Sequence, residues 1–285
     1  MYSQYRKTKN TITLLLTYAF LILFGMFMIY PLLWVVSAAF KSNDEIFKSL
    51  SLIPQKIVTD AFIKGWYGTG QYTFGRFFIN NFILVVPVVF FTIISSTLVA
   101  YGFARFNFPL KKLFFVILIS TLMLPDSVNL IPRYILFNAF GWVDSYKPFI
   151  IPSMFASTPF FVFMMIQFMR GLPREIEEAA IIDGCNSFQI LLRVTGPLCK
   201  TAMISMGIFQ FIWTWNDFLG PLIYINSVEK YTIALGLRMC VDSAAAIAWN
   251  QIMAMTVIAM LPCIIIFFAA QKYFVEGIAT SGIKG

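Results

Sequence analysis

Long apolar segments alternate with short polar connections along the whole 285-residue chain. Six segments are long enough to cross the hydrocarbon core of a bilayer, which takes about 20 apolar residues. They lie at 12–38, 79–104, 113–131, 149–169, 202–225 and 251–271. Because a backbone that faces lipid must satisfy its own hydrogen bonds, each segment is predicted to be helical. The pattern therefore predicts an all-α membrane protein with six transmembrane helices.

The positive charges predict how these helices are oriented. Arg6, Lys7 and Lys9 precede the first apolar segment, so the positive-inside tendency places the N-terminus in the cytoplasm. Six crossings return the C-terminus to the same side, and 12 of the 21 Lys and Arg residues fall in the predicted cytoplasmic parts. The result is a predicted multi-pass protein of the cell membrane, whose net charge of +8 reflects orientation and not nucleic-acid binding.

The composition supports this class and excludes several kinds of site. Hydrophobic residues make up 59% of the chain and charged residues 12%, which is far from the usage of soluble domains. The absence of His excludes imidazole metal sites and His-based acid–base catalysis. The four Cys residues have no metal-binding or redox spacing. We therefore expect no metal site, no disulfide framework and no enzyme.

A cofactor is not expected in this chain either. The Gly-rich stretch "YGTGQYTFG" (67–75) lacks the Gly-Lys-Ser/Thr ending with which a phosphate loop holds phosphates and Mg²⁺, and it is better explained as a flexible turn. The rest of the chain matches no ATP-binding signature. If ATP drives this protein, ATP and Mg²⁺ are bound by another subunit.

The segments divide the chain into three parts. Residues 1–78 form a first transmembrane helix and an extracytoplasmic loop. Residues 79–272 form the core transmembrane domain, which contains a polar cytoplasmic hairpin at 172–197. Residues 273–285 form a cytoplasmic tail, which could contact other subunits or be loose.

The polar insert "EEAAIIDGCNSFQILLRVTGPL" (177–198) is predicted to fold as two helices joined by a turn. Pro173 suits a first helical turn, and three Glu residues that follow lie near the positive end of the helix dipole. They are Glu175, Glu177 and Glu178. Ala179 and Ala180 are strong helix formers. Gly184 fits the left-handed position that ends such a helix.

The second helix of the insert is predicted to start at a cap on Asn186 or Ser187 and to end at the pair Gly196-Pro197. Four residues at helical spacing form a stripe on one of its faces. They are Phe188, Leu191, Leu192 and Thr195. An exposed apolar stripe of this kind needs a protein partner or the membrane surface to cover it.

The string "EAAIIDG", followed after nine residues by "VTGP", resembles the EAA signature of permease subunits of ATP-binding-cassette (ABC) importers, Glu-Ala-Ala-x3-Gly-x9-Ile-x-Leu-Pro. Five residues match at the family spacing, and Val194 occupies the Ile position. The five are Glu178, Ala179, Ala180, Gly184 and Pro197. Gly196 replaces the usual Leu, which is expected to loosen the junction with the fifth transmembrane helix while leaving the hairpin intact.

Other segments resemble the carbohydrate-uptake branch of these permeases, and more narrowly the maltose-system G-type subunit. They are "YGFARFNFP", "MLPDSVNLIP", "WTWNDFLGPLIY" and the ending "QKYFVEGIATSGIKG". The resemblance implies a type I importer fold that pairs as a heterodimer with a homologous permease. It also implies two copies of an ABC ATPase, an extracytoplasmic solute-binding protein and an oligosaccharide substrate.

In such importers the hairpin is the coupling helix, which docks in a cleft of the ATPase. The residues expected to make this contact are Glu178, Ala179, Ala180, Gly184, Phe188 and Leu191. The alternative from the residues alone is a surface hairpin that lies on lipid headgroups.

Polar residues at membrane depth are expensive and are candidates for function. Two sets at i, i+3, i+7 spacing interrupt the third and fifth segments, with Asn216 and Thr214 beside the second set. They are Asp126, Asn129 and Arg133, and Gln210, Trp213 and Asp217. Amides and carboxylates can bind sugar hydroxyls, and an aromatic ring can pack on a sugar face. Hydrogen bonds between helices or to the partner subunit are an equally good explanation.

Three other functions remain as alternatives. The same permease architecture could carry a solute that is not a sugar. An ion-coupled secondary transporter should show internal repeats with helices broken at matching positions, and the chain shows none. A membrane-embedded enzyme would need a catalytic constellation, and only scattered carboxylates are present.

Overall fold

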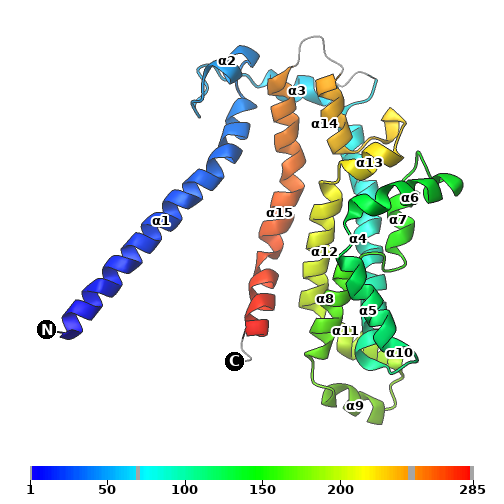
Figure 1. The fold of residues 1–285 in the computed structure, drawn as a ribbon. Coiled ribbons are helices and arrows are strands. Elements are labelled where there is room, and N and C mark those ends of the chain that lie inside the picture. The colour runs from blue at the N-terminus through cyan, green and yellow to red at the C-terminus, as the bar shows by residue number, and fades with distance from the viewer. Residues whose placement is uncertain (1, 69–70, 243–247, 283–285) are drawn as a thin grey trace. The chain divides into compact units, whose positions relative to one another are not determined.

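The computed structural model is helical throughout the part that it describes, which comprises residues 2–68, 71–242 and 248–282. Side chains are described for 13–68, 71–125, 127–241 and 248–271. Helices hold 77% of the chain, and the described residues form no strand (Figure 1). The predicted all-α class is confirmed.

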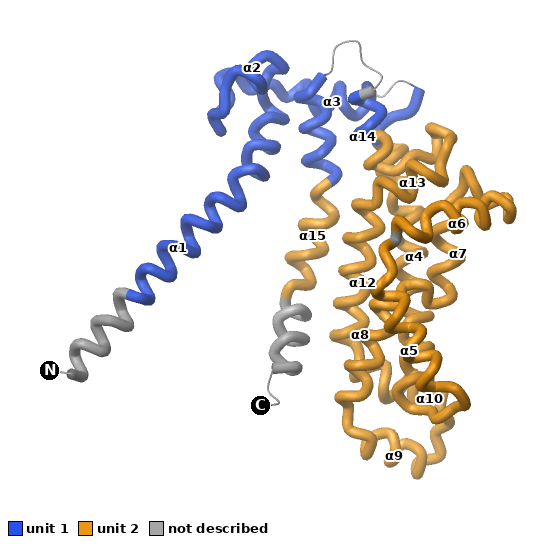
Figure 2. Tube along the Cα trace, in the orientation of Figure 1, with its two compact units in different colours: residues 1–74, 237–259 blue, residues 75–236, 260–285 orange. Residues whose placement is uncertain are grey.

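The chain divides into two compact units, shown in Figure 2. Unit 1 comprises 1–74 and 237–259, and unit 2 comprises 75–236 and 260–285. Unit 1 contains α1 (Tyr2–Ala38), α2 (Asn43–Lys48), α3 (Asp60–Tyr67), most of α14 (Ile233–Asp242) and the start of α15 (Trp249–Gly282). The tail predicted at 273–285 continues α15 to Gly282, and its side chains lie outside the described part.

Unit 1 is a long apolar helix joined to a folded loop. Thr13–Ala38 of α1 is apolar enough to cross a membrane, and of these residues only Ser37 and Ala38, at its end, are buried by other parts of the chain. At the end of α1, the buried Lys41 donates hydrogen bonds to the carbonyl oxygens of Ser49 and Ser51. The hydroxyl of Ser37 donates to the carbonyl oxygen of Leu52 at 2.6 Å. These bonds fold the 41–58 segment against the helix end.

Unit 2 is a bundle of longer helices with short helices at both ends. Its helices are α4 (Phe74–Arg105), α5 (Lys111–Leu122), α6 (Asp126–Ala139), α7 (Lys147–Ser153), α8 (Pro159–Arg170), α9 (Glu175–Ile182), α10 (Ser187–Ile190), α11 (Gly196–Leu198), α12 (Lys200–Trp215) and α13 (Leu219–Tyr224), together with the start of α14 and the part of α15 from residue 260 onward. A π-helical turn, Leu191–Thr195, joins α10 to α11, and a 3-10 turn, Val228–Lys230, follows α13. In Figure 1, α4, α5, α8 and α12 run side by side, with α9 and α10 at one end.

The core of the bundle is apolar and rich in Met. It is contributed by α4, α8, α12 and the π turn, and it comprises Ala100, Tyr101, Ala104, Phe161, Val162, Met165, Ile166, Met169, Leu191, Cys199, Ala202 and Met206. The small residues of α4 allow close approach of the unbranched Met side chains, which fill irregular gaps. This core holds the end of α4 against the part of the chain that was predicted as a hairpin.

Three of the six predicted transmembrane segments form continuous helices, and the other three are broken. Three helices of the described chain are long and apolar enough to cross a membrane: Thr13–Ala38, Phe74–Arg105 and Trp249–Gln271. The predicted segment 113–131 forms α5 and α6, which are bent by 106° and together give a fourth candidate. Segments 149–169 and 202–225 form the pairs α7/α8 and α12/α13. The number of crossings and the cytoplasmic termini stay predictions.

The breaks have local causes. Pro125 precedes α6 and Pro159 begins α8, and a residue before proline is disfavoured in the α conformation. Ala156 adopts a positive φ of 52°, which no regular helix contains. After α12, the Asp217 carboxylate accepts the backbone N–H of Gly220 at 3.0 Å and thereby starts α13. Non-helical backbone at membrane depth is tolerated where it is buried in protein or lines a cavity.

Candidate functional site

The hairpin predicted from the sequence is present at one end of unit 2. Helix α9 ends where the Gly184 N–H donates to the Ile181 carbonyl at 3.0 Å and the Cys185 N–H donates to the Ala180 carbonyl at 2.9 Å. This pair of bonds is a Schellman motif, which requires a left-handed residue, and Gly184 has φ +81°. The predicted role of Gly184 in the turn is confirmed.

The second helix of the hairpin begins at Asn186, one of the two predicted caps. The Asn186 side chain accepts the Gln189 backbone N–H at 2.9 Å, and the Gln189 side chain accepts the Asn186 N–H at 2.9 Å. This reciprocal capping box satisfies two backbone donors that would otherwise lack partners. The geometry of the turn is therefore fixed by bonds within the hairpin itself.

The predicted end of this helix and its predicted stripe need correction. Helical backbone continues past Gly196-Pro197 to Leu198 by way of the π turn. A Cβ atom on Gly196 would lie 2.7 Å from the Leu191 carbonyl oxygen, so the absent side chain of Gly196 leaves room for this turn. The π turn also shifts the helical phase of the residues that follow Leu191, because it holds more residues per turn than an α-helix. Phe188 remains 62% exposed, whereas Leu191 is 5% exposed and belongs to the core.

The exposed surface of the hairpin differs accordingly from the predicted one. Of the six coupling candidates, four are exposed and two are buried. Glu178, Ala179, Gly184 and Phe188 are exposed, and Ala180 and Leu191 are buried. Ile181 and Ile182, which the sequence reasoning missed, are also exposed, and Ile182 is 86% exposed. Exposed apolar side chains beside acidic ones form a surface suited to contact with a protein.

The base of the hairpin carries a buried ion pair. Arg105, at the end of α4, donates from Nε to Oε1 of Glu177 at 2.8 Å. The Thr195 hydroxyl donates to the same oxygen at 2.7 Å. The sequence reasoning treated Glu177 only as one of three acidic residues near a helix start. Its two partners lie 72 and 18 positions away in the sequence. The only signal for this pairing in the sequence was that the basic connection after α4 and the acidic hairpin were both predicted on the cytoplasmic side.

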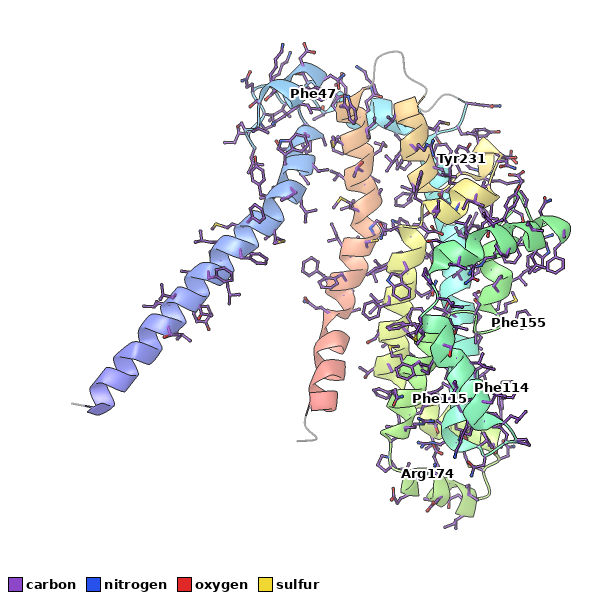
Figure 3. The ribbon with its side chains drawn as sticks, viewed as in Figure 1. Phe47, Phe114, Phe115, Phe155, Arg174 and Tyr231 are labelled. Carbon is purple, nitrogen blue, oxygen red and sulfur yellow. The ribbon has the colours of Figure 1, made fainter. Side chains whose placement is uncertain are left out.

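Three cationic side chains, those of Lys111, Arg170 and Arg174, lie near this base. The Arg170 guanidinium lies 5.0 Å above the ring of Phe115. Figure 3 labels Phe115 and Arg174. Lys111, at the start of α5, lies close enough to Arg170 and Arg174 to feel their positive charges. This concentration of positive charge agrees with the predicted cytoplasmic side.

A cavity of about 660 Å³ lies elsewhere in unit 2. Its volume is within the range of about 300–1,000 Å³ that is usual for small-molecule sites. The wall is contributed by α4, α5, α6, α7, α8 and α12 and by the breaks between them. Its polar and aromatic members include Thr92, Thr121, Arg133, Phe149, Ser157, Thr158, Phe160, Gln210, Trp213, Thr214 and Asp217.

Two buried polar atoms of this wall have no hydrogen-bond partner among the residues that the structure describes. Nε2 of Gln210 donates to the Thr214 hydroxyl at 2.7 Å, while Oε1 of Gln210 accepts no hydrogen bond from any described residue. The buried Thr92 hydroxyl is likewise unpartnered within the described part. A flip of the Gln210 amide would leave the nitrogen unpartnered in place of the oxygen. A buried polar group without a partner is costly, and a hydroxyl-bearing ligand would satisfy both groups.

Aromatic and acidic groups complete the wall. The Trp213 ring packs against Phe161 and Phe160 at centroid distances of 5.1 and 5.5 Å, and it is still half exposed. The Asp217 carboxylate is held at the start of α13 by its bond to Gly220. The wall therefore offers an aromatic face, a carboxylate and unpaired hydroxyl and amide groups, which together suit a polyhydroxylated ligand.

The six predicted pathway residues are not all on this wall. Gln210, Trp213 and Asp217 are brought together there, as their spacing predicted. Asn216 is exposed and donates to the Ile212 carbonyl at 2.8 Å, and Asn129 lies half buried on α6 away from the wall. The side chain of Asp126 lies outside the described residues. Within the described residues, no group of three or more Cys, Asp and Glu could hold a metal ion.

The end of unit 2 opposite the hairpin is closed by a polar clamp. Asp144, at φ +57°, accepts hydrogen bonds from the backbone of Asn226 and Ser227 at 3.0 and 2.8 Å. Its carboxylate also lies 2.8 Å from the Lys230 ammonium. The Lys230 ammonium and these donors hold the pKa of Asp144 well below its usual range. The clamp joins the segment after α6 to the segment after α13.

The fold and these two sites define a membrane permease of the ABC importer type. The chain belongs to the family described as binding-protein-dependent transport system inner membrane components, whose pattern matches residues 77–280. It is thus an inner-membrane permease subunit of a transport system and not a catalytic subunit.

Curated relatives and a solved structure agree with this family. The chain is 34% identical over 269 residues to the probable ABC transporter permease protein YurM of Bacillus subtilis, covering 94% of this chain and 88% of the relative. It is 30% identical to AraQ of the same species, an arabinooligosaccharides transport system permease, covering 93% and 94%. It is 33% identical to UgpE of Pectobacterium atrosepticum, an sn-glycerol-3-phosphate transport system permease, covering 89% and 91%.

The fold itself is similar to that of a chain in a bacterial ABC transporter that imports the acidic polysaccharide alginate. The TM-score is 0.83 with 22% sequence identity, covering 93% of this chain and 98% of the other. At this identity the likeness concerns the fold, and it confirms the type I importer permease fold predicted from the sequence.

Proposed function

We propose that this permease imports a carbohydrate, in particular an oligosaccharide, through a pathway that includes the unit 2 cavity. The observation that carries the proposal is the wall of that cavity, where Trp213, Asp217 and the unpartnered groups of Gln210 and Thr92 meet. Sugars combine hydroxyl groups with apolar ring faces, and this wall has a counterpart for each. The relative AraQ, which belongs to an arabinooligosaccharide system, supports the same solute class.

The coupling role belongs to the exposed surface of the hairpin. In the proposed assembly, this chain pairs with a homologous permease, and two ATPase subunits bind ATP and Mg²⁺. Phe188, Ile182 and Glu178 contact one ATPase, and an extracytoplasmic binding protein delivers the solute. Six crossings with both termini in the cytoplasm place the hairpin on the ATPase side, in agreement with the cations near its base.

A phosphorylated polyol is the second candidate solute. Arg133 lines the cavity, and a guanidinium is well matched to a phosphate group. The relative UgpE, which belongs to an sn-glycerol-3-phosphate system, supports this alternative. The two candidates differ in charge, so competition experiments separate them.

The test begins with the complete complex purified from cells that express all its subunits. Wild-type protein should retain the ATPase, and Gly184→Trp should lose it because the turn requires φ +81° and lies on the docking surface. Gly141→Trp is the matched control, since Gly141 also has a positive φ, +65°, but lies away from the hairpin. Retention of the ATPase by Gly184→Trp would contradict the docking assignment.

The solute is tested by uptake into proteoliposomes with a binding protein of the same system. Labelled oligosaccharide should be taken up in an ATP-dependent manner, and excess glycerol 3-phosphate should not compete. Asp217→Ala should lower uptake while leaving the ATPase attached. Competition by glycerol 3-phosphate would favour the second candidate, and unchanged uptake in Asp217→Ala would place the solute contacts in the partner permease.

A further inference from the structure

Glu177 joins three segments that are far apart in the sequence. Its Oε1 atom accepts hydrogen bonds from Arg105 at the end of α4 and from Thr195 in the π turn. Arg105 also reaches the Leu172 carbonyl oxygen at 3.5 Å, at the chain's entry into the hairpin. One carboxylate therefore ties both arms of the hairpin to α4.

This joint is dry. The Arg105 and Glu177 side chains are 7% and 13% exposed, and Thr195 is fully buried. The neighbouring Cys199 is buried as well, and burial raises the pKa of its thiol to about 11. A buried ion pair is weak support for stability, because the loss of hydration offsets most of the attraction. A fixed geometry between two helices is the better-attested use of such a pair.

Two local features of the backbone position Glu177 and Thr195 for this contact. Thr195 lies at the end of the π turn, which has room only because Gly196 has no side chain. Glu177 lies in the first turn of α9, so its carboxylate is held at the base of the hairpin while the apolar residues of the far end remain exposed. The docking surface and the joint therefore lie on different parts of the same short helix pair.

Helix α4 connects this joint to the cavity. It runs without interruption from Phe74 to Arg105, and its residues Val88 and Thr92 line the cavity wall. From Thr92 to Arg105 the distance along the helix is about 20 Å at 1.5 Å per residue. A helix of this kind transmits a displacement of its end as a rigid element.

We propose that Glu177 is a positioning residue that couples movement of the hairpin to α4 through its bonds to Arg105 and Thr195. The proposal rests on the proposed function, since it concerns how ATPase-driven hairpin movement reaches the solute cavity. It predicts that breaking the joint separates ATP hydrolysis from transport while leaving ATPase docking in place.

The experiment compares Glu177→Gln with Glu175→Gln in the complete complex in proteoliposomes. Glu175 lies in the same first turn of α9 but is exposed, so it is a matched control. Glu177→Gln should retain the ATPase and lower the solute transported per ATP by about tenfold, which corresponds to about 1.4 kcal/mol. Glu175→Gln should leave this ratio unchanged. Hydrogen exchange of the α9 amides should rise in Glu177→Gln and not in Glu175→Gln.

A double-mutant cycle tests whether the pair acts as a unit. Arg105→Gln should lower the ratio as Glu177→Gln does, and the double variant should be no worse than either single variant. Additive losses, an unchanged ratio in Glu177→Gln, or loss of the ATPase from that variant would overturn the proposal. A wild-type complex that neither binds an ATPase nor transports would contradict the proposed function instead, and the exchange of the α9 amides would still test the joint.

Discussion

The hairpin base and the cavity wall of unit 2 differ in whether their buried polar atoms have hydrogen-bond partners. At the base of the hairpin, Arg105 and Thr195 both donate hydrogen bonds to the Glu177 carboxylate, at 2.8 and 2.7 Å. At the cavity wall, Oε1 of Gln210 and the Thr92 hydroxyl are buried without a partner in the described part of the chain. Both regions lie in helices that pack on the same bundle, so the difference concerns chemistry and not burial.

The difference indicates separate tasks. A fully paired polar network has one preferred geometry, and it resists displacement of the segments that it joins. An unpaired buried group destabilises the protein alone and is satisfied when a ligand supplies the missing partner. The hairpin base is therefore suited to transmit movement, and the cavity is suited to accept a solute whose hydroxyl groups both donate and accept.

The largest expected effect comes from the glycine beside the paired region. Gly196→Ala places a Cβ 2.7 Å from the Leu191 carbonyl oxygen, which is backbone and cannot turn away. We expect the π turn to distort, with a cost of about 1–3 kcal/mol in stability, as is typical of overpacking. Thermal unfolding of the purified complex measures this. Gly102→Ala on α4 is the control, because nothing lies within 4 Å of its Cβ and Ala favours a helix. Equal unfolding temperatures for both variants would show that the turn tolerates a side chain.

A somewhat smaller effect is expected in the unpaired region, from the aromatic face. Trp213→Ala removes the ring that packs on Phe160 and Phe161 and borders the cavity. Because an aromatic contact contributes about 0.5–1.5 kcal/mol, uptake at low solute concentration should fall by up to about tenfold. Trp213→Phe should recover most of it. Uptake kinetics in proteoliposomes check this, and a loss confined to ATPase attachment would remove Trp213 from the solute pathway.

Two threonine variants, one at the hairpin base and one at the cavity wall, compare the two regions directly, with expected changes in stability of about 1 kcal/mol. Thr195→Val deletes a hydroxyl that donates to Glu177, so stability should fall by about 1 kcal/mol. Thr92→Val deletes an unpartnered hydroxyl, so stability should stay equal or rise by a similar amount, while the KM for solute should increase.

Thr97→Val is the control for the second variant. Thr97 is also buried on α4 with an unpartnered hydroxyl within the described part, but it does not line the cavity. It should change stability as Thr92→Val does and leave the KM unchanged. An equal rise of the KM in both threonine variants would mean that the cavity hydroxyl has no special role.

The sequence predicted the local features of this comparison better than the long-range ones. Gly184, the Asn186 cap and the spacing of Gln210, Trp213 and Asp217 depend on neighbours within a few residues, and the structure agrees with each. Leu191 was predicted to share an exposed stripe with Phe188 but is buried in the core, because helical spacing does not show which neighbouring helices cover a position.

The long-range side-chain pairings and the breaks in the apolar helices could not be predicted from local sequence in the same way. The bond from Arg105 to Glu177 spans 72 positions, and one sequence does not reveal which of several acidic residues pairs. The apolar segments predicted continuous helices because length and hydropathy do not report bends. Pro125 and Pro159 marked two of the breaks, but the cavity that these breaks border depends on how the helices pack.

The smallest expected effect concerns the clamp at Asp144, which is paired like the hairpin base but half exposed. Because the pKa of Asp144 is lowered in the folded protein, chiefly by Lys230, the clamp contributes stability above the unfolded pKa of about 3.9. That contribution is retained from neutral pH down to about 4 and is lost as the pH falls further. With side chains 30% and 35% exposed, the pair should contribute about 1 kcal/mol or less.

Asp144→Asn tests this clamp, since Asn also tolerates the left-handed backbone at this position. The variant should unfold at a slightly lower temperature than wild type at pH 7 and at pH 5. This temperature difference should narrow below about pH 4, where the Asp144 carboxylate of the unfolded wild-type chain begins to be protonated while that of the folded protein stays charged. Asp60→Asn, which removes an exposed ion pair with Lys64, should unfold at the same temperature as wild type at every pH. If the difference in unfolding temperature between Asp144→Asn and wild type widened on acidification, the linkage would have the opposite sign. Polar pairing would then stabilise the buried hairpin base but not the exposed end of the same unit.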